Sequence, residues 1–172
     1  MSEPASAVRA LMRRAPQLVT VVTAGGPEGP RGITVSSFIP VSLDPPLVLV
    51  SIMNSARAHS AIAAGAFRVH LLASDQTDVS GHFAMPGLDS EAQFGGQFAE
   101  AVEAVGTEEP PRIPGCIGWL ECATAGSYAE GDHTLFIGRV TEGRVERPDA
   151  APLLYYDRGY RDVGGAVNGG SG

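Results

Sequence analysis

The sequence contains no lysine, and its 12 arginines are scattered along the chain rather than gathered in one stretch. The 19 aspartates and glutamates outnumber them, so the formal net charge is −7. Nucleic acids and anionic membranes are bound by proteins that cluster basic side chains on one surface. The composition therefore argues against a nucleic acid or a membrane surface as the partner.

Long apolar runs are also missing. No stretch of 18 apolar residues is present, and the N-terminal sequence MSEPASAVRALMRRAP lacks the apolar core of a signal peptide. We therefore expect no membrane-spanning segment and a cytoplasmic location.

Cysteine is scarce, with only Cys116 and Cys122 in 172 residues. Both fall in one predicted strand, where six positions of extended chain separate them by about 20 Å. This distance is too great for a disulfide bond or a shared metal ion. We expect two buried cysteines that act as apolar side chains.

Short motifs of several enzyme classes do not occur either. The sequence has no GxSxG, no HExxH and no GxGxxG, so a Rossmann-type dinucleotide site is not supported. What is present is 44% hydrophobic residues, together with 22 glycines and 13 prolines. This composition fits one domain with a sizeable core and many turns between short elements.

Apolar and β-branched runs predict a chain built mainly of strands. We predict strands at 17–26, 32–43, 47–53, 67–73, 116–129 and 133–146, and short helices at 7–15, 55–65 and 76–84. Segment 87–112 is irregular and acidic, with Phe94 and Phe98 as contacts to the core. Segment 152–161 is a short strand or a loop, and 163–172 is a flexible tail.

The order of these elements indicates the fold class. The tripeptide Glu130-Gly131-Asp132 between the two longest strands is typical of a hairpin. Regular alternation of strand and helix is absent, which argues against a doubly wound sheet. Strands joined mostly by hairpins favour a mainly β, antiparallel barrel that closes so that its edges disappear.

The stretch SIMNSARAHSAIAAG, residues 51–65, has an unusual charge for a helix start. Ser55 is a good cap, yet Arg57 and His59 fall in the predicted first turn, where the backbone already carries partial positive charge. A bound phosphate would reconcile these features, because the N–H groups, the Ser55 hydroxyl and the Arg57 guanidinium would all bind it. The alternative is that Ser55 only caps the helix and Arg57 extends into water.

The segment GITVSSF, residues 32–38, places hydroxyl groups on both faces of a strand. Thr34, Ser36 and Ser37 interrupt the clean alternation expected of a strand with one buried face. Small hydroxyls beside backbone N–H groups suit a flat polar ring edge or a sugar-alcohol chain. Serine and threonine paired within the sheet explain the pattern equally well.

Among the histidines, His133 is the best candidate for a functional role. It follows the predicted Gly131-Asp132 turn, where a hairpin end can reach over a neighbouring pocket and Asp132 can orient the ring. His70 lies inside a predicted strand and is interpreted as structural, and His82 at a helix end is compatible with either role.

Taken together, the chain from about residue 7 to 161 resembles the flavin reductase-like family, the split β-barrel NAD(P)H:flavin oxidoreductases of two-component monooxygenases. The matching segments are VTVVTAGG and RGITVSSFIPVSLDPPLVLVS within 19–51, SARAH at 55–59, HFA at 82–84, WLEC at 119–122, GDHTLFIGRV at 131–140 and PLLYYDRGYR at 152–161. Each is weak alone, but their order and spacing together are specific.

The resemblance implies a six-stranded antiparallel split barrel spanning 7–162, a homodimer, and FMN or FAD near the subunit interface. It assigns the isoalloxazine and ribityl chain to Thr34, Val35, Ser36 and Ser37. The residues implied for the phosphate and that end of the flavin are Ser51, Asn54, Ser55, Ala56, Arg57, His59, Phe83 and Ala84. His133 would lie beside the flavin where nicotinamide stacks, and Tyr156 and Tyr160 are weaker candidates for the rim.

The function implied by the resemblance is hydride transfer from NADH or NADPH to FMN or FAD, with reduced flavin supplied to a monooxygenase. The low number of basic residues gives no obvious site for a 2′-phosphate, which favours NADH. One alternative is a flavin-binding protein or electron carrier that uses no nicotinamide, which the acidic segment 99–112 would suit if it covers the nicotinamide side. Another is a split-barrel enzyme that oxidises a pyridoxine phosphate or uses a deazaflavin.

Overall fold

The computed structural model describes residues 2–100, 106 and 108–164. Its helices are α1 (Glu3–Met12), α2 (Ala58–Ala63), α3 (Thr77–Ala84), α4 (Ser90–Phe94) and the 3-10 turn η1 (Gly96–Phe98). Its strands are β1 (Gln17–Leu18), β2 (Thr20–Ala24), β3 (Arg31–Val35), β4 (Ile39–Leu43), β5 (Pro46–Met53), β6 (Ala66–Leu71), β7 (Gly118–Glu130), β8 (His133–Val145), β9 (Leu154–Tyr156) and β10 (Gly159–Arg161).

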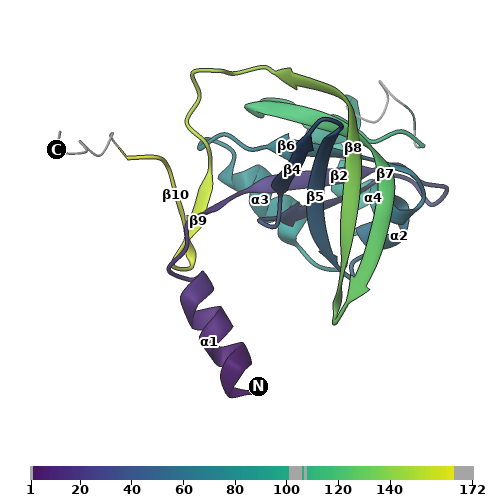
Figure 1. The fold of residues 1–172 in the computed structure, drawn as a ribbon. Helices are drawn as coiled ribbons and strands as arrows, with labels where there is room; N and C mark the ends of the chain where they lie inside the picture. Colours follow the sequence, from purple (N-terminus) through teal and green to yellow (C-terminus); the bar gives the residue numbers. More distant parts are fainter. Residues whose placement is uncertain (1, 101–105, 107, 165–172) are drawn as a thin grey trace.

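Seven strands form one strongly curved antiparallel sheet in the order β3-β2-β6-β7-β8-β5-β4 (Figure 1). The two longest strands, β7 and β8, are joined by the tight turn Gly131–Asp132, so the predicted hairpin is confirmed. Gly131 has φ of 63°, a conformation that glycine adopts without strain. The mainly β, split-barrel fold predicted from the sequence is confirmed.

The barrel is split where the sequence predicted one continuous strand over 32–43. That segment bends after Val35 and forms two strands, of which β3 pairs with β2 and β4 pairs with β5. Across the split, the Ser37 hydroxyl donates to the Ser51 carbonyl at 2.8 Å and accepts from the Ser51 N–H at 3.0 Å. A side chain thus replaces the main-chain ladder that a closed barrel would have, and the sheet counts seven strands instead of six.

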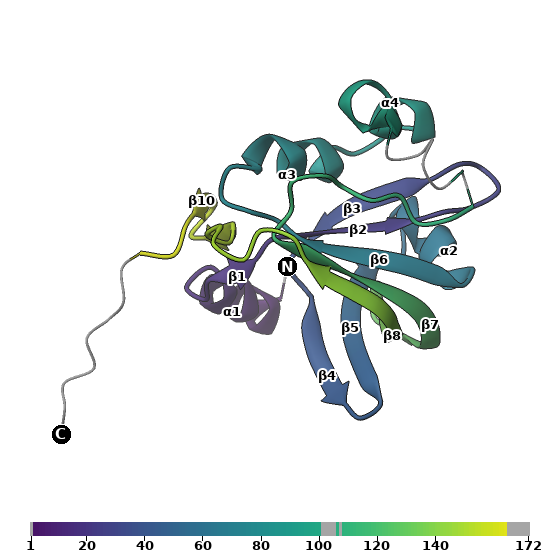
Figure 2. The same cartoon turned by 90° about the horizontal axis from the view of Figure 1, so that it is seen from above.

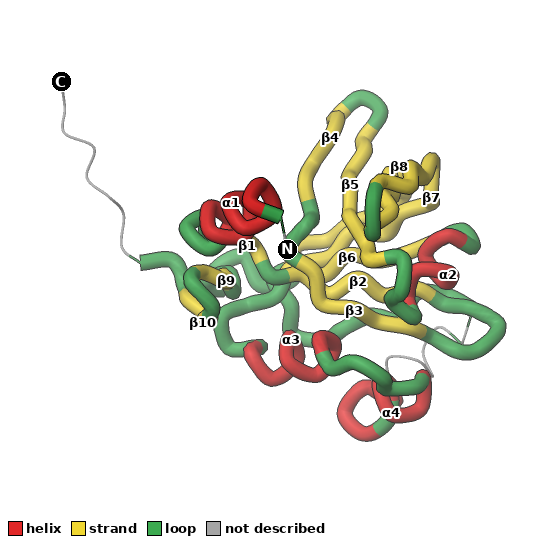
Figure 3. Tube along the Cα trace, turned by 90° about the horizontal axis from the view of Figure 1, so that it is seen from below, coloured by secondary structure: helices red, strands yellow, loops and turns green. Residues whose placement is uncertain are grey.

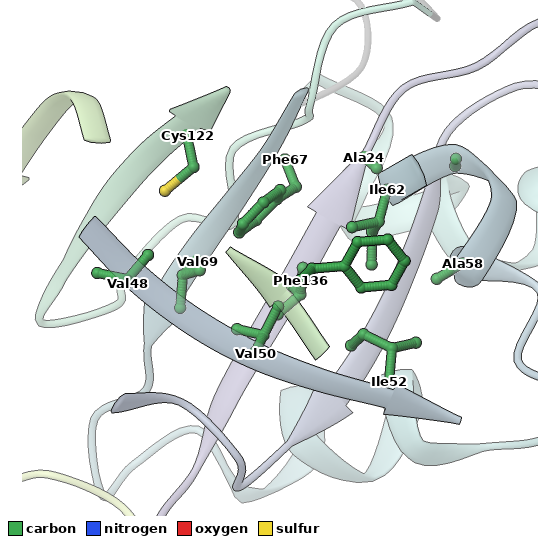
Figure 4. Close-up of a cluster of buried hydrophobic side chains, with 12 residues drawn as sticks. Ala24, Val48, Val50, Ile52, Ala58, Ile62, Phe67, Val69, Cys122 and Phe136 are labelled. Carbon is green, nitrogen blue, oxygen red and sulfur yellow. The ribbon is translucent and has the colours of Figure 1, made fainter. Parts of the chain in front are cut away.

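The core has two parts, one on each face of the sheet. Inside the barrel, Phe67, Phe136, Ile52 and Ile62 pack with β-branched residues of β2 and β5 (Figure 4). On the outer face, α3, α4 and η1 cover β2 and β3, and the predicted contacts Phe94 and Phe98 are buried there. Because β2 is buried on both faces, its sequence lacks a polar alternation.

The chain ends form a small appendage beside the barrel. Strands β1, β9 and β10 make a three-stranded sheet, and α1 extends from it away from the barrel (Figures 1 and 3). The predicted helix at 7–15 is displaced: α1 begins at Glu3, where a proline in the first turn and an acidic side chain favour a helix start, and it ends at Met12. Segment 152–161, predicted as strand or loop, contains β9 and β10.

The two cysteines of the chain are apolar side chains of the interior. Cys116 and Cys122 are both buried and free, as predicted, although Cys116 precedes β7. Burial raises the pKa of the Cys116 thiol to about 11 and that of the Cys122 thiol to about 12.

Of the predicted tail 163–172, residues 165–172 lie outside the described residues. Within residues 2–100, 106 and 108–164, no helix has the length and apolar character needed to cross a membrane.

Candidate functional site

The site is built on the edge strand β3 and the helix α3 that lies along it (Figure 2). A Cβ at Gly32 would come within 2.5 Å of the Phe83 ring, so only glycine lets α3 pack this closely. On the free edge of β3, the Gly32 N–H donates to the Gln93 side-chain oxygen at 3.1 Å, and the Gln93 side-chain N–H donates to the Gly32 carbonyl at 3.0 Å. Main-chain groups of residues two apart point the same way, so those of Thr34 also point off this edge.

A first hollow, the Thr34 pocket, lies at this edge and has a volume of about 250 Å³. The Thr34 hydroxyl donates to the Ser80 carbonyl at 2.8 Å, and the Tyr160 hydroxyl donates to the Ser80 hydroxyl at 2.9 Å. The appendage therefore supplies one wall and α3 the other. The lining residues are Val19, Thr34, Val35, Ser36, Ser80, Ala84, Tyr155 and Tyr160.

A second hollow, the Arg57 pocket, has a volume of about 400 Å³ and lies between the loop before α2 and the segment after α3. The exposed Arg57 side chain crosses this space and donates to the Leu88 carbonyl at 3.3 Å, a long bond to a neutral acceptor. The lining residues are Gly32, Ile33, Met53, Ser55, Ala56, Arg57, Ala58, Phe83, Ala84, Met85, Pro86, Gly87, Leu88 and Gln93.

Ala84 lines both pockets, so the two hollows meet at the end of α3. Eight of the sequence-predicted residues line one pocket or both: Thr34, Val35, Ser36, Ser55, Ala56, Arg57, Phe83 and Ala84. The combined space is elongated, with hydroxyls and a strand edge at one end and a guanidinium at the other.

The predicted helix start at Ser55 is wrong. Helix α2 begins only at Ala58, Arg57 is its N-cap residue in a helical conformation, and no side chain caps it. The chain first makes a turn in which the Ala56 N–H donates to the Met53 carbonyl at 2.9 Å and the His59 N–H donates to the Ala56 carbonyl at 3.0 Å. The turn therefore uses two of the N–H groups that a helix starting at Ser55 would leave for a phosphate, those of Ala56 and His59.

Asn54 and His59, also predicted to bind the cofactor, are bonded within the protein. The His59 Nε2–H donates to the Thr134 hydroxyl at 2.8 Å, and that hydroxyl donates to Asn54 Oδ1 at 2.8 Å. The Asn54 N–H also donates to the Asp132 carbonyl at 2.9 Å. These bonds fix the loop before α2 against β8, and neither residue lines the two pockets.

Ser37, Ser51 and His133 also lie outside the two pockets. Ser37 and Ser51 bond each other across the barrel split. His133 is paired in register with Met53, which lines the Arg57 pocket, so it is one strand removed from it. Its Nδ1–H donates to Asp132 Oδ1 at 2.6 Å, and this bond holds the pKa of the Asp132 carboxyl below its ordinary value.

Sequence reasoning missed several residues that shape the site. Gln93, which hydrogen-bonds the main chain of Gly32, lies in the segment predicted to be irregular. Ser80 accepts the Thr34 hydroxyl through its carbonyl, and nothing in the sequence distinguishes it from the other serines. Tyr155 rather than Tyr156 lines the Thr34 pocket beside Tyr160. Adjacent residues in a strand face opposite sides, and two neighbouring tyrosines give no signal for which side faces the site.

His70 confirms its structural interpretation and helps to anchor the acidic segment. Its ring is fully buried, with Nδ1–H donating to the Val21 carbonyl and Nε2 accepting from the Ile113 N–H, both at 3.1 Å. Burial lowers the pKa of His70 to about 3. Residues 108–112 pack on β2 and β6 and line neither pocket. Residues 101–105 and 107 of the predicted cover lie outside the described residues.

The two pockets fit an elongated phosphorylated cofactor with a flat ring. A strand edge can hydrogen-bond the donors and acceptors of a heteroaromatic ring, and an exposed guanidinium beside Ser55 can bind a phosphate. Among the described residues, no group of three or more histidine, cysteine, aspartate or glutamate side chains is arranged to hold a metal ion.

Comparison with known proteins agrees with this geometry. A family model described as the flavin reductase like domain matches residues 12–164. The FMN reductase (NADH) SmoA of Agrobacterium fabrum is 41% identical over 138 residues, which cover 80% of this chain and 74% of that protein.

Two solved structures are similar over nearly the whole chain. The NADH:FAD oxidoreductase SgcE6 of Streptomyces globisporus, in complex with NAD and FAD fragments, has a TM-score of 0.79 and 34% identity over 95% of this chain and 96% of its own. BorF, the flavin reductase component of a bacterial two-component tryptophan halogenase, has a TM-score of 0.81 and 30% identity over 94% and 99%. The chain therefore belongs to the flavin reductase-like family.

Proposed function

We propose that this protein is a flavin reductase that transfers hydride from NADH to FMN or FAD. The observation that carries the proposal is the meeting of two unlike pockets at Ala84, one with a polar strand edge and one with Arg57. The relatives SmoA and SgcE6 are named as an NADH-dependent FMN reductase and an NADH:FAD oxidoreductase, which supports the same assignment for this chain.

The residues around the Arg57 pocket bind the flavin phosphate in this proposal. Arg57 supplies the charge and Ser55 a hydroxyl, while Asn54 and His59 hold the loop in place through Thr134. Phe83 and Ala84 close the pocket from α3, and Ala56 contacts the same end. Because the Arg57 bond to Leu88 is long, little is lost when the guanidinium turns to a phosphate.

The residues around the Thr34 pocket orient the flavin ring. The Thr34 main-chain groups bind the ring edge, while Val35 and Ser36 line the same wall. Ser37 and Ser51 act indirectly, because their mutual bonds fix the bend that ends β3. His133, held by Asp132, stands at the nicotinamide side of the site.

Bound flavin supplies the chemistry by accepting a hydride from the reduced nicotinamide. The protein contributes orientation and exclusion of water, which is why the site has no acid–base triad among its described residues. A scarcity of basic residues argues for NADH over NADPH.

The test is NADH oxidation, followed at 340 nm with free FMN or FAD as acceptor and repeated with NADPH. We expect NADH consumption that depends on added flavin. Flavin binding without consumption of either nicotinamide would identify an electron carrier instead, and absence of flavin binding would overturn the proposal.

Arg57→Ala tests the phosphate assignment. We expect flavin affinity to fall several-fold in a fluorescence titration, because one charge-assisted contact is lost. The free energy of unfolding should change by less than about 0.5 kcal/mol, because the side chain is exposed. Arg139→Ala, an exposed arginine on β8 that lines none of these pockets, is the control for flavin affinity. Unchanged FMN affinity in Arg57→Ala would contradict the assignment.

We further propose that the flavin-binding domain spans 7–162 and that the protein acts as a cytoplasmic homodimer, supplying reduced flavin to a monooxygenase. A role as a reductase component is supported by the similarity to BorF. A dimer is supported by the edge strand β4, where Ile39, Val41 and Leu43 are exposed. Apolar side chains on an unpaired edge favour association with a second copy of the chain.

Light scattering on a sizing column tests the dimer. We expect twice the chain mass for the unchanged protein and the mass of a single chain for Leu43→Lys. A single-chain mass for the unchanged protein would contradict the dimer but not the reductase activity.

A further inference from the structure

A third hollow adjoins the Arg57 pocket on the far side of the Arg57 side chain. This Arg31 pocket has a volume of about 280 Å³ and shares Arg57 with the second pocket. It lies between the turn at 26–29, the start of β3 and the surface of α2. Its lining residues are Gly26, Pro27, Glu28, Gly29, Arg31, Arg57, Ser60, Ala61 and Ala64.

Arg31 is poorly partnered for a guanidinium with so little exposure. Its side chain is only 12% exposed, yet the nearest carboxylate oxygen, on Glu28, is 3.8 Å away and belongs to a side chain that is 89% exposed. Its other contact is the carbonyl of neighbouring Pro30, at 3.4 Å. Partly buried charges are normally matched by close, well-shaped partners, so these long contacts indicate room for a better anion.

The strand geometry orders the groups along one line. Side chains alternate along β3, so Arg31 and Ile33 face the α2 side, while Gly32 and Thr34 face α3. From Thr34 the pockets therefore continue through Ala84 to Arg57 and then to Arg31. An elongated ligand with its ring at Thr34 and a phosphate at Arg57 would meet a second cation only if it extends beyond that phosphate.

The pocket wall is fixed and lined by small residues. The Gly29 N–H donates to the Gly26 carbonyl at 2.9 Å, and Gly29 has φ of 87° and packs so closely on Ser90 that a Cβ would lie 2.5 Å from its hydroxyl oxygen. The glycine, alanine and proline residues of the lining have little or no side chain, so they leave room for a planar base. Arg31 and Arg57 suit the phosphates that precede it.

We propose that the Arg31 pocket binds the adenosine monophosphate portion of FAD, with Arg31 on the second phosphate and the adenine against Ala61 and Ala64. The inference rests on the proposed function and sharpens it, because it makes FAD the preferred flavin. Since NADH also carries an adenosine monophosphate portion, the experiment separates the two sources.

The experiment compares FMN and FAD binding by fluorescence titration in the unchanged protein and in Arg31→Ala. We expect the unchanged protein to bind FAD several-fold more tightly than FMN. Arg31→Ala should weaken FAD binding about tenfold, because one charge-assisted contact is lost, and leave FMN binding within twofold. Glu28→Gln should strengthen FAD binding slightly, because it removes the competing carboxylate, and Arg139→Ala on β8 is the matched arginine control.

Other results of the FMN and FAD titrations contradict either the role of Arg31 or the proposed function. Equal loss of FMN and FAD affinity, or no loss of either, overturns the assignment of Arg31. An increased KM for NADH with FMN as acceptor, at unchanged FAD affinity, would place the dinucleotide co-substrate in the pocket instead. If Arg31→Ala does not fold, Ala64→Glu, at the exposed position that follows α2, gives the same test, with selective loss of FAD binding expected. Absence of any flavin binding by the unchanged protein would be a failure of the proposed function itself.

Discussion

Arg68 in the middle of β6 and Arg57 in the loop before α2 have opposite surroundings. Arg68 is 5% exposed, forms an ion pair with Glu121, donates to the Pro110 carbonyl and lies 5.0 Å from the centre of the Trp119 ring. Arg57 is exposed and has one long bond to a carbonyl. The first arginine is part of the fold, whereas the second has a contact that a ligand can replace.

The difference shows how one residue type serves two purposes in a chain without lysine. Around Arg68, His70 and Arg112 complete a cluster whose polar groups meet protein partners. The exception is the buried Arg68 Nε, which has no hydrogen-bond partner among the described residues. Around Arg57, side chains line hollows instead of meeting each other. Substitutions should therefore reduce stability in the first region and ligand affinity in the second.

The largest effect is expected from Arg68→Ala. The change leaves Glu121 and the Pro110 carbonyl without their partner and removes the contact with Trp119. Because the Glu121 side chain is 32% exposed and water can reach it, we expect a loss of up to about 3 kcal/mol in the free energy of unfolding, the low end of the range for a buried pair, measured by urea titration. Arg139→Ala, exposed on β8, is the control. A loss below about 1 kcal/mol would show that the cluster does not stabilise the fold.

Gly32→Ala tests whether the site also contains structural positions. The added Cβ would meet the Phe83 ring at 2.5 Å, so α3 must shift away from β3. We expect a loss of about 1–3 kcal/mol together with weaker flavin binding, since both pockets depend on the end of α3. Gly81→Ala on α3, where a Cβ has open space, is the control. Unchanged stability with weaker flavin binding would show that Gly32 serves ligand binding and not the stability of the fold.

His70→Asn should change how stability depends on pH. The folded pKa of His70 is about 3 against an ordinary value of 6.5, so the unfolded chain takes up a proton that the folded protein excludes. The stability that the folded protein gains from a neutral His70 is complete above pH 6.5, where the unfolded chain is also neutral at this position. It is lost as the pH falls towards 3, by about 2 kcal/mol between pH 7 and pH 5. The variant should be less stable at pH 7 but lose less on acidification. Parallel curves for the two proteins would contradict a neutral buried His70.

The smallest effect is expected from Ser37→Ala. It removes the hydroxyl that bonds both main-chain groups of Ser51 across the barrel split. The free energy of unfolding should fall by about 1 kcal/mol, because the Ser51 groups are only partly buried and water can replace one bond. Ser127→Ala, at an exposed position of β7 outside the pockets, is the control. Reduced flavin affinity at full stability would mean that Ser37 contacts the ligand directly.

The sequence predicts the strands well because their apolar runs and the Gly131–Asp132 turn are local signals. It does not predict the bend after Val35, since that bend depends on partners that are distant in the chain, namely β2 for β3 and β5 for β4. The same limit applies to Ser37, whose hydroxyl pattern was read equally well as ligand contact or sheet pairing. The structure pairs it with Ser51.

Thr34, Ser55 and Arg57, which the resemblance assigns to the cofactor, line the two pockets, and their role in binding stays a prediction. Physical reasoning on the helix start failed, because the turn from Met53 to His59 delays α2 until Ala58. Helix propensity of an alanine-rich run does not fix its first residue. Gln93 and Tyr155 were missed because each acts through a tertiary contact that leaves no local pattern.

The loop before α2 and the first turn of α2 divide their side chains between two directions: Asn54 and His59 bond inward to Thr134, while Ser55 and Arg57 border open hollows. The anchoring positions and the contacting positions are thus different residues. Substitutions at Ser55 and Arg57 can lengthen or shorten the residence time of a ligand, while Asn54 and His59 keep the loop in place. In the proposed role of supplying reduced flavin to a monooxygenase, such independence lets exchange rates evolve one residue at a time.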